Sequence, residues 1–160
     1  MENNSSKKEA SRKKSLGELG ELFAIKAIVD KGFDKIRNLN DQKLNEPFAD
    51  IFCEKNGVRY IISIKARNKY QKNGTLNTRY NLGSNVYEKV LKSEKTYNAI
   101  AHWMAIQFDE KSFSIYFGTI KELNGSKAIP IDKCEKGLVG TKWEYNKRHF
   151  FDFDFYSNSK

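Results

Sequence analysis

The sequence predicts an α/β fold, in which helices flank a mixed central sheet within one domain. An amphipathic helix precedes the first strand, an Asn-Gly pair joins two strands near the middle, and a second helix separates these from two more strands. A chain of 160 residues, 39% of them hydrophobic, can bury one sizeable core. No repeat or linker indicates a second domain.

The first helix is expected to begin at Ser15, because Ser15-x-x-Glu18 has the form of a capping box, and to end at Gly32. The residues before it, 1–14, are polar and basic, and we expect them to be disordered, either as a phosphate-binding arm or as a solvated tail. Residues 15–156 then form the single domain. The apolar face of the helix consists of Leu16, Leu19, Leu22, Phe23, Ala27 and Ile28.

Alternating and continuous apolar runs predict the strands, and Asn56-Gly57 is a strong signal for a two-residue hairpin turn. A second helix is expected at 85–97, capped by Ser84 or Asn85. Residues 120–148 are interpreted as one short helix or turn near 120–124 followed by loops. The expected strands are 33–39, 48–55, 58–67, 99–108, 112–119 and 149–156.

The formal charge of +9 at pH 7 indicates a polyanionic partner, most simply nucleic acid, although membranes and acidic proteins also attract basic chains. We expect no membrane partner, since no apolar run approaches the roughly 18 residues of a membrane helix. The charged N-terminus is unlike a signal peptide, and Cys53 and Cys134 are expected to be reduced thiols. Together these features predict a cytoplasmic protein.

The hairpin turn predicts which side chains lie beside Lys65. If Asn56 and Gly57 are the turn residues, Lys55 faces Val58, and the register continues until Asp50 faces Ser63. Side chains alternate between the two faces of a strand, so Asp50, Ser63 and Lys65 should gather at the end of the hairpin away from its turn. This group is either a structural ion pair on a solvated sheet face or a catalytic cluster for phosphodiester hydrolysis, with Mg²⁺ held by the carboxylate.

Pro47-Phe48-Ala49-Asp50, followed thirteen residues after Asp50 by Ser63-Ile64-Lys65, resembles the core motif of the PD-(D/E)xK nuclease superfamily. The segment with Gly17, Glu21 and Gly32-Phe33 is similar to the first helix of archaeal Holliday-junction resolvases. The order of a helix, three strands, a helix and two strands is similar to the restriction-endonuclease-like αβββαβ core. The resemblance covers about residues 15–118.

The resemblance implies that Asp50 is a metal ligand, that Lys65 is the catalytic lysine and that the backbone carbonyl of Ile64 is a further ligand. It implies that Glu21 is a helix-borne acid bound to the metal or to a water, although Glu18, three residues earlier, shares its side of the helix. Ser63 departs from the family, which has Glu or Asp there. Some restriction enzymes of the superfamily have Ser at this place and an acid on the following helix, where this chain has Glu88, but Asn85-x-x-Glu88 also fits a capping box.

A basic, tyrosine-bearing run follows the Lys65 strand, and we expect it to contact nucleic acid rather than to form only a solvated loop. Its residues are Arg67, Lys69, Tyr70, Lys72, Arg79 and Tyr80.

The resemblance therefore predicts an endonuclease that depends on Mg²⁺, with Mn²⁺ as a substitute, that cleaves DNA as a homodimer, and that needs no small-molecule cofactor. One alternative is a catalytically inactive nuclease fold that binds nucleic acid or assists a partner, because Ser63 replaces the acid of the family. Another is an RNA-binding module.

Overall fold

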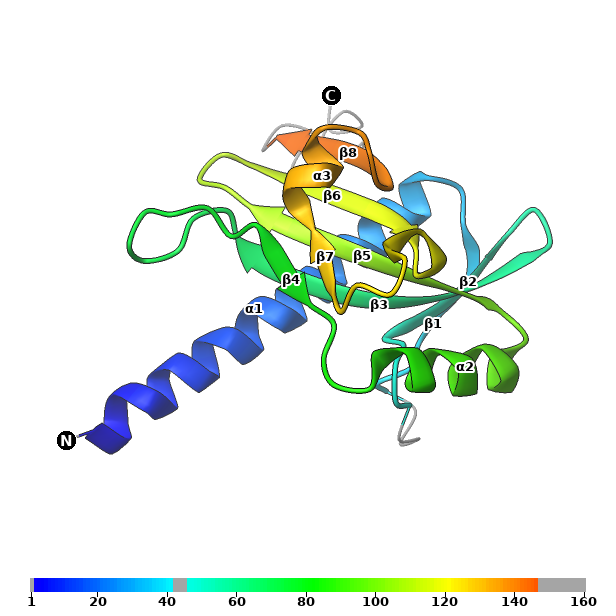
Figure 1. The fold of residues 1–160 in the computed structure, drawn as a ribbon, viewed down its shortest axis with the longest axis horizontal. Helices are drawn as coiled ribbons and strands as arrows, with labels where there is room; N and C mark the ends of the chain where they lie inside the picture. Colours follow the sequence, from blue (N-terminus) through cyan, green and yellow to red (C-terminus); the bar gives the residue numbers. More distant parts are fainter. Residues whose placement is uncertain (1, 42–45, 147–160) are drawn as a thin grey trace, which may run out of the picture.

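A six-stranded mixed sheet forms the centre of the protein and is covered on both faces (Figure 1). The structure is a computed structural model and describes residues 2–41 and 46–146. The elements in chain order are α1 (Glu2–Asp30), β1 (Asp34–Asn38), β2 (Ile51–Lys55), β3 (Val58–Asn68), β4 (Arg79–Asn81), α2 (Val86–Tyr97), β5 (Ile100–Phe108), β6 (Ser112–Thr119), the 3-10 turn η1 (Lys121–Leu123), β7 (Ala128–Pro130), α3 (Ile131–Glu135) and β8 (Thr141–Asn146).

The strands of the main sheet lie in the order β1-β2-β3-β5-β6-β8, and β4 pairs with β7 in a separate two-stranded sheet. β3 and β5 are parallel, whereas the other neighbouring pairs are antiparallel. Parallel neighbours need a long crossover connection, and here it contains β4 and α2. The predicted mixed sheet flanked by helices is therefore confirmed.

The β2–β3 hairpin has the predicted register, with Lys55 opposite Val58 and Phe52 opposite Ile61. Asn56 and Gly57 form the two-residue turn, and both have positive φ (51° and 77°). Turns of this kind match the twist of paired strands, and Asn and Gly adopt them most readily. Local turn chemistry thus sets the register on which the candidate site depends.

Two cores lie on opposite faces of the sheet. On one face Ala24, Ala27 and Ile28 of α1 pack against apolar residues of the central strands, such as Ile62 and Met104. On the other face α2, the β4–β7 pair, η1 and α3 cover a core that includes Trp103 and Tyr116. Cys53 and Cys134 are free thiols, as predicted, and burial raises the pKa of each to about 12.

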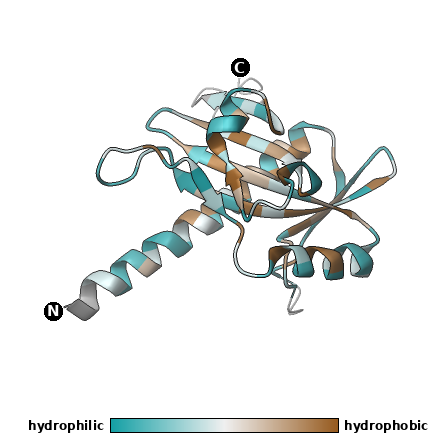
Figure 2. Ribbon diagram, viewed as in Figure 1, coloured by the Kyte–Doolittle hydropathy of each residue, from teal (hydrophilic) through white to brown (hydrophobic). Residues whose placement is uncertain are grey.

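Helix α1 differs from the prediction at its start. It begins at Glu2, not at Ser15, and so takes in residues 2–14, which the sequence suggests are disordered. The Ser15 hydroxyl donates to the Ser11 carbonyl (3.1 Å) within the helix and does not cap it. The segment has no Gly or Pro to stop the helix, and its Ala, Lys, Arg and Glu residues are good helix formers. Its N-terminal half is largely hydrophilic (Figure 2).

The packing face of α1 is also narrower than expected. Leu19 (43% exposed) and Leu22 (64% exposed) point away from the sheet. Small residues make the contact instead: a Cβ atom at Gly20 would lie 2.4 Å from the Cβ atom of Ala66 on β3. A helix can lie this close to a sheet only where its contacting residues are small.

The segment after β6 contains more structure than the sequence suggests. Here η1 matches the expected turn, but β7, α3 and β8 occupy residues expected to be loops. β7 and α3 are three and five residues long, too short to show a period, and each is held by tertiary pairing or packing. The strand expected at 149–156 lies outside the described residues.

Helix α2 begins one residue after Asn85, which has a left-handed conformation and makes no side-chain capping bond, so the expected capping box does not form.

Within the described part of the chain, no helix is both long enough and apolar enough to cross a membrane.

The contact between α1 and β3 predicts opposite effects for two glycines of one helix. Gly20→Ala should lower stability by about 1–3 kcal/mol, because the new methyl group overlaps Ala66. Gly17→Ala should raise it by about 0.5–1 kcal/mol, because nothing lies within 4 Å of the new Cβ atom and Ala favours a helix. Thermal unfolding of both variants checks this, and a similar stabilisation by both would contradict the packing described.

Candidate active site

The candidate site lies where β2 and β3 part. The ladder between them ends near Ile51 and Ile62, with one further bond from the Asp50 N–H to the Ile62 carbonyl (2.9 Å). β3 continues to Asn68, paired with β5 on its other side. On the side of β3 where β2 has ended, the N–H of Ile64 donates to Oδ2 of Asp50 (2.7 Å). The carboxylate thus takes the place of a strand residue at the newly exposed edge.

The backbone carbonyl of Ile64 faces the same edge. In an antiparallel ladder the N–H and C=O of one residue point to the same side of its strand. Since the Ile64 N–H points to Asp50, its carbonyl oxygen lies on the Asp50 side as well. Asp50 and Ile64 together therefore present a carboxylate and a carbonyl oxygen, which are ligands that Mg²⁺ prefers.

Asn40 links α1 to this edge. Its side-chain N–H group donates to Oε1 of Glu21 (3.0 Å) and to Oδ1 of Asp50 (3.2 Å). The neighbouring Leu39 N–H donates to the Asp50 carbonyl (2.8 Å), which fixes the end of β1 beside Asp50. The structure therefore brings Glu21 and Asp50 together, as the resemblance implies. The sequence does not reveal the role of Asn40, which is one of several polar residues in its loop.

Both carboxylates are held in surroundings that disfavour their charge. Burial raises the pKa of Asp50, against the opposing effects of the Ile64 N–H, Asn40 and the charge of Lys65. Burial, followed by the nearby charges of Asp50, Asp41 and Glu18, raises the pKa of Glu21. A cation placed between the two acids would relieve both effects.

Ser63 and Lys65 lie on β3 on either side of Ile64. Ser63 is 3% exposed, and Lys65 is half-buried. Within the described residues Lys65 forms no ion pair, yet its charge is close enough to lower the pKa of Asp50. The predicted hairpin register is that of the structure from Lys55–Val58 to Ile51–Ile62, and the ladder ends before the expected Asp50–Ser63 pair.

Glu46, which sequence reasoning missed, anchors the Asp50 segment to α2. One carboxylate oxygen accepts the N–H groups of Phe48 (2.9 Å) and Ala49 (3.0 Å) and the hydroxyl of Ser93 on α2. With three donors on one oxygen, Glu46 acts as a structural clamp. The available signal is its place before Pro47, where a carboxylate can bond the next N–H groups as in a local turn.

Glu88 and Glu21 are placed differently. Glu88 is exposed on the first turn of α2, whereas Val86, Val90 and Ser93 form the buried face of that helix. No contact between described residues joins Glu88 to Asp50. Over residues 2–41 and 46–146 there is also no group of three or more His, Cys, Asp and Glu side chains arranged to hold a metal. Glu21 and Asp50, with the Ile64 carbonyl, are the donors that the structure brings together.

Four of the six residues of the basic run after Lys65 are exposed. Arg67, Lys72, Arg79 and Tyr70 are exposed and Lys69 is half-buried. Tyr80 is fully buried in the core under β4, so the expectation that it contacts nucleic acid is wrong. Its strand pairs with β7, and this pairing turns the ring inward; the sequence gives no sign of it.

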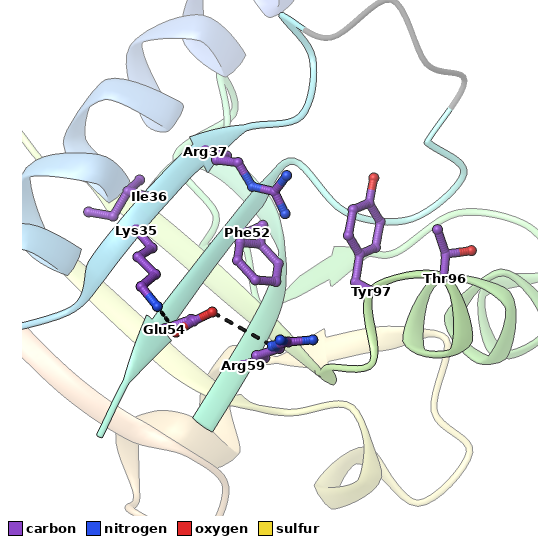
Figure 3. Close-up of a pocket in the computed structure, with 8 residues that line it drawn as sticks. All are labelled: Lys35, Ile36, Arg37, Phe52, Glu54, Arg59, Thr96 and Tyr97. Carbon is purple, nitrogen blue, oxygen red and sulfur yellow. Dashed lines mark ion pairs between the residues drawn. The ribbon is translucent and has the colours of Figure 1, made fainter. Parts of the chain in front are cut away.

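A pocket lined by three cations and one acid lies over β1, β2 and the end of α2 (Figure 3). Phe52, which lines it, follows Asp50 by two residues and so lies on the same face of the strand. Glu54 forms ion pairs with Lys35 (3.1 Å) and Arg59 (3.6 Å). The Arg37 guanidinium lies 4.3 Å from the centre of the Phe52 ring and has no carboxylate partner among the described residues. The pocket is completed by Ile36, Thr96 and Tyr97.

The fold is similar to that of a Holliday junction resolvase. The match is to Hjc of the archaeal hyperthermophile Archaeoglobus fulgidus, with a TM-score of 0.56 and 16% sequence identity, over 77% of this chain and 95% of that chain. The likeness confirms the restriction-endonuclease-like architecture. No protein-family model and no curated protein matches the sequence.

The buried charge of Asp50 predicts a pH-dependent effect of Asp50→Asn. The pKa of Asp50 is raised in the folded protein, so its ionisation as the pH increases lowers the stability of the wild type. Asn at this position carries no charge and avoids that loss. In EDTA, the melting temperature of Asp50→Asn relative to wild type should therefore be higher at pH 8 than at pH 4. Glu88→Gln, which changes an exposed carboxylate, is the control, and a difference for Asp50→Asn that stays constant with pH would contradict the prediction.

Proposed function

We propose that this protein is a metal-dependent DNA endonuclease of the PD-(D/E)xK type, which hydrolyses phosphodiester bonds. The observation that carries the proposal is the junction of β2 and β3, where Asp50, the Ile64 carbonyl, Glu21 and Lys65 meet in a resolvase-like fold. By the same resemblance, we propose that it acts on DNA as a homodimer in the cytoplasm.

The donor set suits a hard divalent cation. The Asp50 carboxylate and the Ile64 carbonyl would hold Mg²⁺ or Mn²⁺ directly. Glu21 is joined to Asp50 through the side chain of Asn40, which donates to both acids. When bound, the ion activates water and offsets the charge that develops on the phosphate. The raised pKa values of Asp50 and Glu21 support this assignment, because both acids lie close together in a partly buried site.

The chain's own residues have separate roles in the reaction. Lys65, which no ion pair in the described chain engages, stabilises negative charge on the phosphate or orients the nucleophile. Asn40 keeps the two acids in place by donating to both of them. The Ser63 hydroxyl, at the place of the family's second acid, donates a hydrogen bond to a water or a phosphate oxygen.

Cationic residues on both sides of this cluster support a nucleic-acid substrate. Arg37 lies in the pocket on one side, and Arg67 lies two residues beyond Lys65 on the other. Contacts from Arg and Lys to phosphates position a duplex without reading its sequence.

The second candidate is a catalytically inactive nuclease fold that binds nucleic acid or assists a partner. Ser63 favours it, as does the lack of a three-acid group in the described chain. The two candidates differ in cleavage and not in binding.

Cleavage of linear, supercoiled and four-way-junction DNA in Mg²⁺ or Mn²⁺ tests the proposal, with an RNA of matching sequence as a further substrate. Asp50→Ala and Lys65→Ala should each lower the cleavage rate by about 10²–10³-fold, since the first removes a proposed metal ligand and the second removes a positive charge that acts on the reacting phosphate. A wild type that binds DNA and cuts no substrate with either ion is the result expected of the inactive candidate. Preference for RNA would favour an RNA-binding module.

Glu21 and Glu88 are a matched pair of single-charge changes. Glu21→Gln should weaken both cleavage and the rise in melting temperature caused by Mn²⁺, because Glu21 shares Asn40 with Asp50. Glu88→Gln should change neither, because Glu88 is exposed on α2. A loss of cleavage in Glu88→Gln would show instead that the acid missing at Ser63 has moved to that helix.

A further inference from the structure

A groove of about 680 Å³ lies between the N-terminal half of α1 and the loop after β3. Leu16 lies on one side of it, and Tyr70, half exposed, lies on the other. Its lining also includes Glu9, Arg12, Lys13, Arg67, Asn68, Gln71, Lys72 and Asn77.

The N-terminal half of α1 has no packing role that explains its length. The helix projects beyond the sheet (Figure 1), and its residues from Ser5 to Ser15 are exposed except for Glu9. Glu9 forms an ion pair with Lys72 of the facing loop (2.7 Å) and a longer one with Arg12 (3.4 Å). The ion pair with Lys72 joins the two walls of the groove.

Only one face of this helical segment borders the groove. Glu9, Arg12, Lys13 and Leu16 follow the spacing of one helix face, which continues into Gly20 and the buried stripe of α1. Lys7 and Lys14 lie about 150° away around the helix, since each residue turns it by about 100°. The same helix thus carries two basic pairs, one on the groove and one on the opposite face.

The groove is basic and begins next to the candidate active site. Four cations, Arg12, Lys13, Arg67 and Lys72, face one carboxylate, Glu9, giving a net charge of +3 (four minus one). Arg67 follows Lys65 by two residues, about 7 Å along β3. Leu16 precedes Glu21 by five residues, about 7.5 Å along α1.

We propose that this groove binds the sugar-phosphate backbone of the DNA strand adjacent to the cleaved phosphate, with Arg12 and Lys13 of α1 as one wall and Arg67 and Lys72 as the other. The proposal rests on the proposed function and adds the N-terminal half of α1 to the substrate-binding surface. Long flexible cations facing one another across an open groove suit phosphates of any sequence. The contact therefore contributes affinity and orientation and leaves sequence preference unchanged.

Two double variants with equal charge change test the groove. Binding of the full-length chain to duplex and junction DNA is measured in EDTA at several salt concentrations. Arg12→Glu with Lys13→Glu should weaken binding at least tenfold and reduce the slope of log K against log [salt] by about 2, at roughly 0.9 for each phosphate contact. Lys7→Glu with Lys14→Glu, on the opposite face, should weaken binding less than threefold and leave the slope near that of wild type.

Glu9→Gln provides a change in the other direction. It removes the acid from the groove without adding bulk, and binding should tighten about two- to fivefold and keep the same sequence preference. Circular dichroism and the melting temperature of each variant serve as controls that the helix is retained. Equal losses in the two double variants, or weaker binding by Glu9→Gln, would overturn the groove proposal.

The experiments distinguish failure of the groove proposal from failure of the proposed nuclease function. If the wild type binds DNA but does not cut it, the affinities and salt slopes still decide whether the groove holds the backbone. If the wild type cuts DNA and the groove variants bind as the opposite-face variants do, the groove is wrong and the nuclease remains. If the wild type binds no nucleic acid, both proposals are overturned.

Discussion

The bond from the Ile64 N–H to the Asp50 carboxylate is the contact on which the candidate site depends. It forms at the one place where β3 loses its β2 neighbour but keeps β5, so that a backbone edge is exposed inside the sheet. Buried backbone N–H groups need partners, and here the partner is an ionisable side chain. The same bond turns the Ile64 carbonyl toward Asp50 and sets Lys65 one residue further along.

The surrounding structure holds Asp50 in this position from three directions. Leu39, the residue after β1, donates to its carbonyl, and Asn40 donates to its carboxylate. Glu46 binds the N–H groups of the two residues before Asp50 and the hydroxyl of Ser93 on α2. The site therefore rests on β1, α1 and α2 as well as on the hairpin. Burial raises the pKa of both acids, and clusters of acids with raised pKa values are common at functional sites.

Two hollows with basic lining lie beside this site. The pocket with Arg37 lies at one side, and the groove between α1 and the loop after β3 lies at the other. Several cations are already engaged: Lys35 and Arg59 share Glu54, Lys69 pairs with Asp109, and Lys72 pairs with Glu9. Arg37, Arg67 and Lys13 have no ion pair among the described residues, so these three cations on the two sides of the candidate active site are free to meet an anionic ligand.

The sequence by itself determined the C-terminal half of α1, the strands β1, β2, β3, β5 and β6, the helix α2 and the register of the hairpin; it did not predict β4. These depend on local physics: apolar periodicity, and a turn in which Asn56 and Gly57 accept positive φ. From that register the grouping of Asp50, Ser63 and Lys65 followed by counting, and the resemblance added Glu21. The start of α1 was misjudged because a capping-box pattern at Ser15 was given more weight than the helix propensity of the residues before it.

Only the tertiary structure decided the roles of Asn40 and Glu46, the burial of Tyr80 and the two-walled groove. Each depends on a contact between segments far apart in the chain: Asn40 with Glu21, Glu46 with Ser93, β4 with β7, and Lys72 with Glu9. A local pattern carries no information about such partners, because residue type and spacing are the same whether the partner is present or absent. The short elements β7 and α3 escaped prediction for the same reason, since packing stabilises them rather than their own propensity.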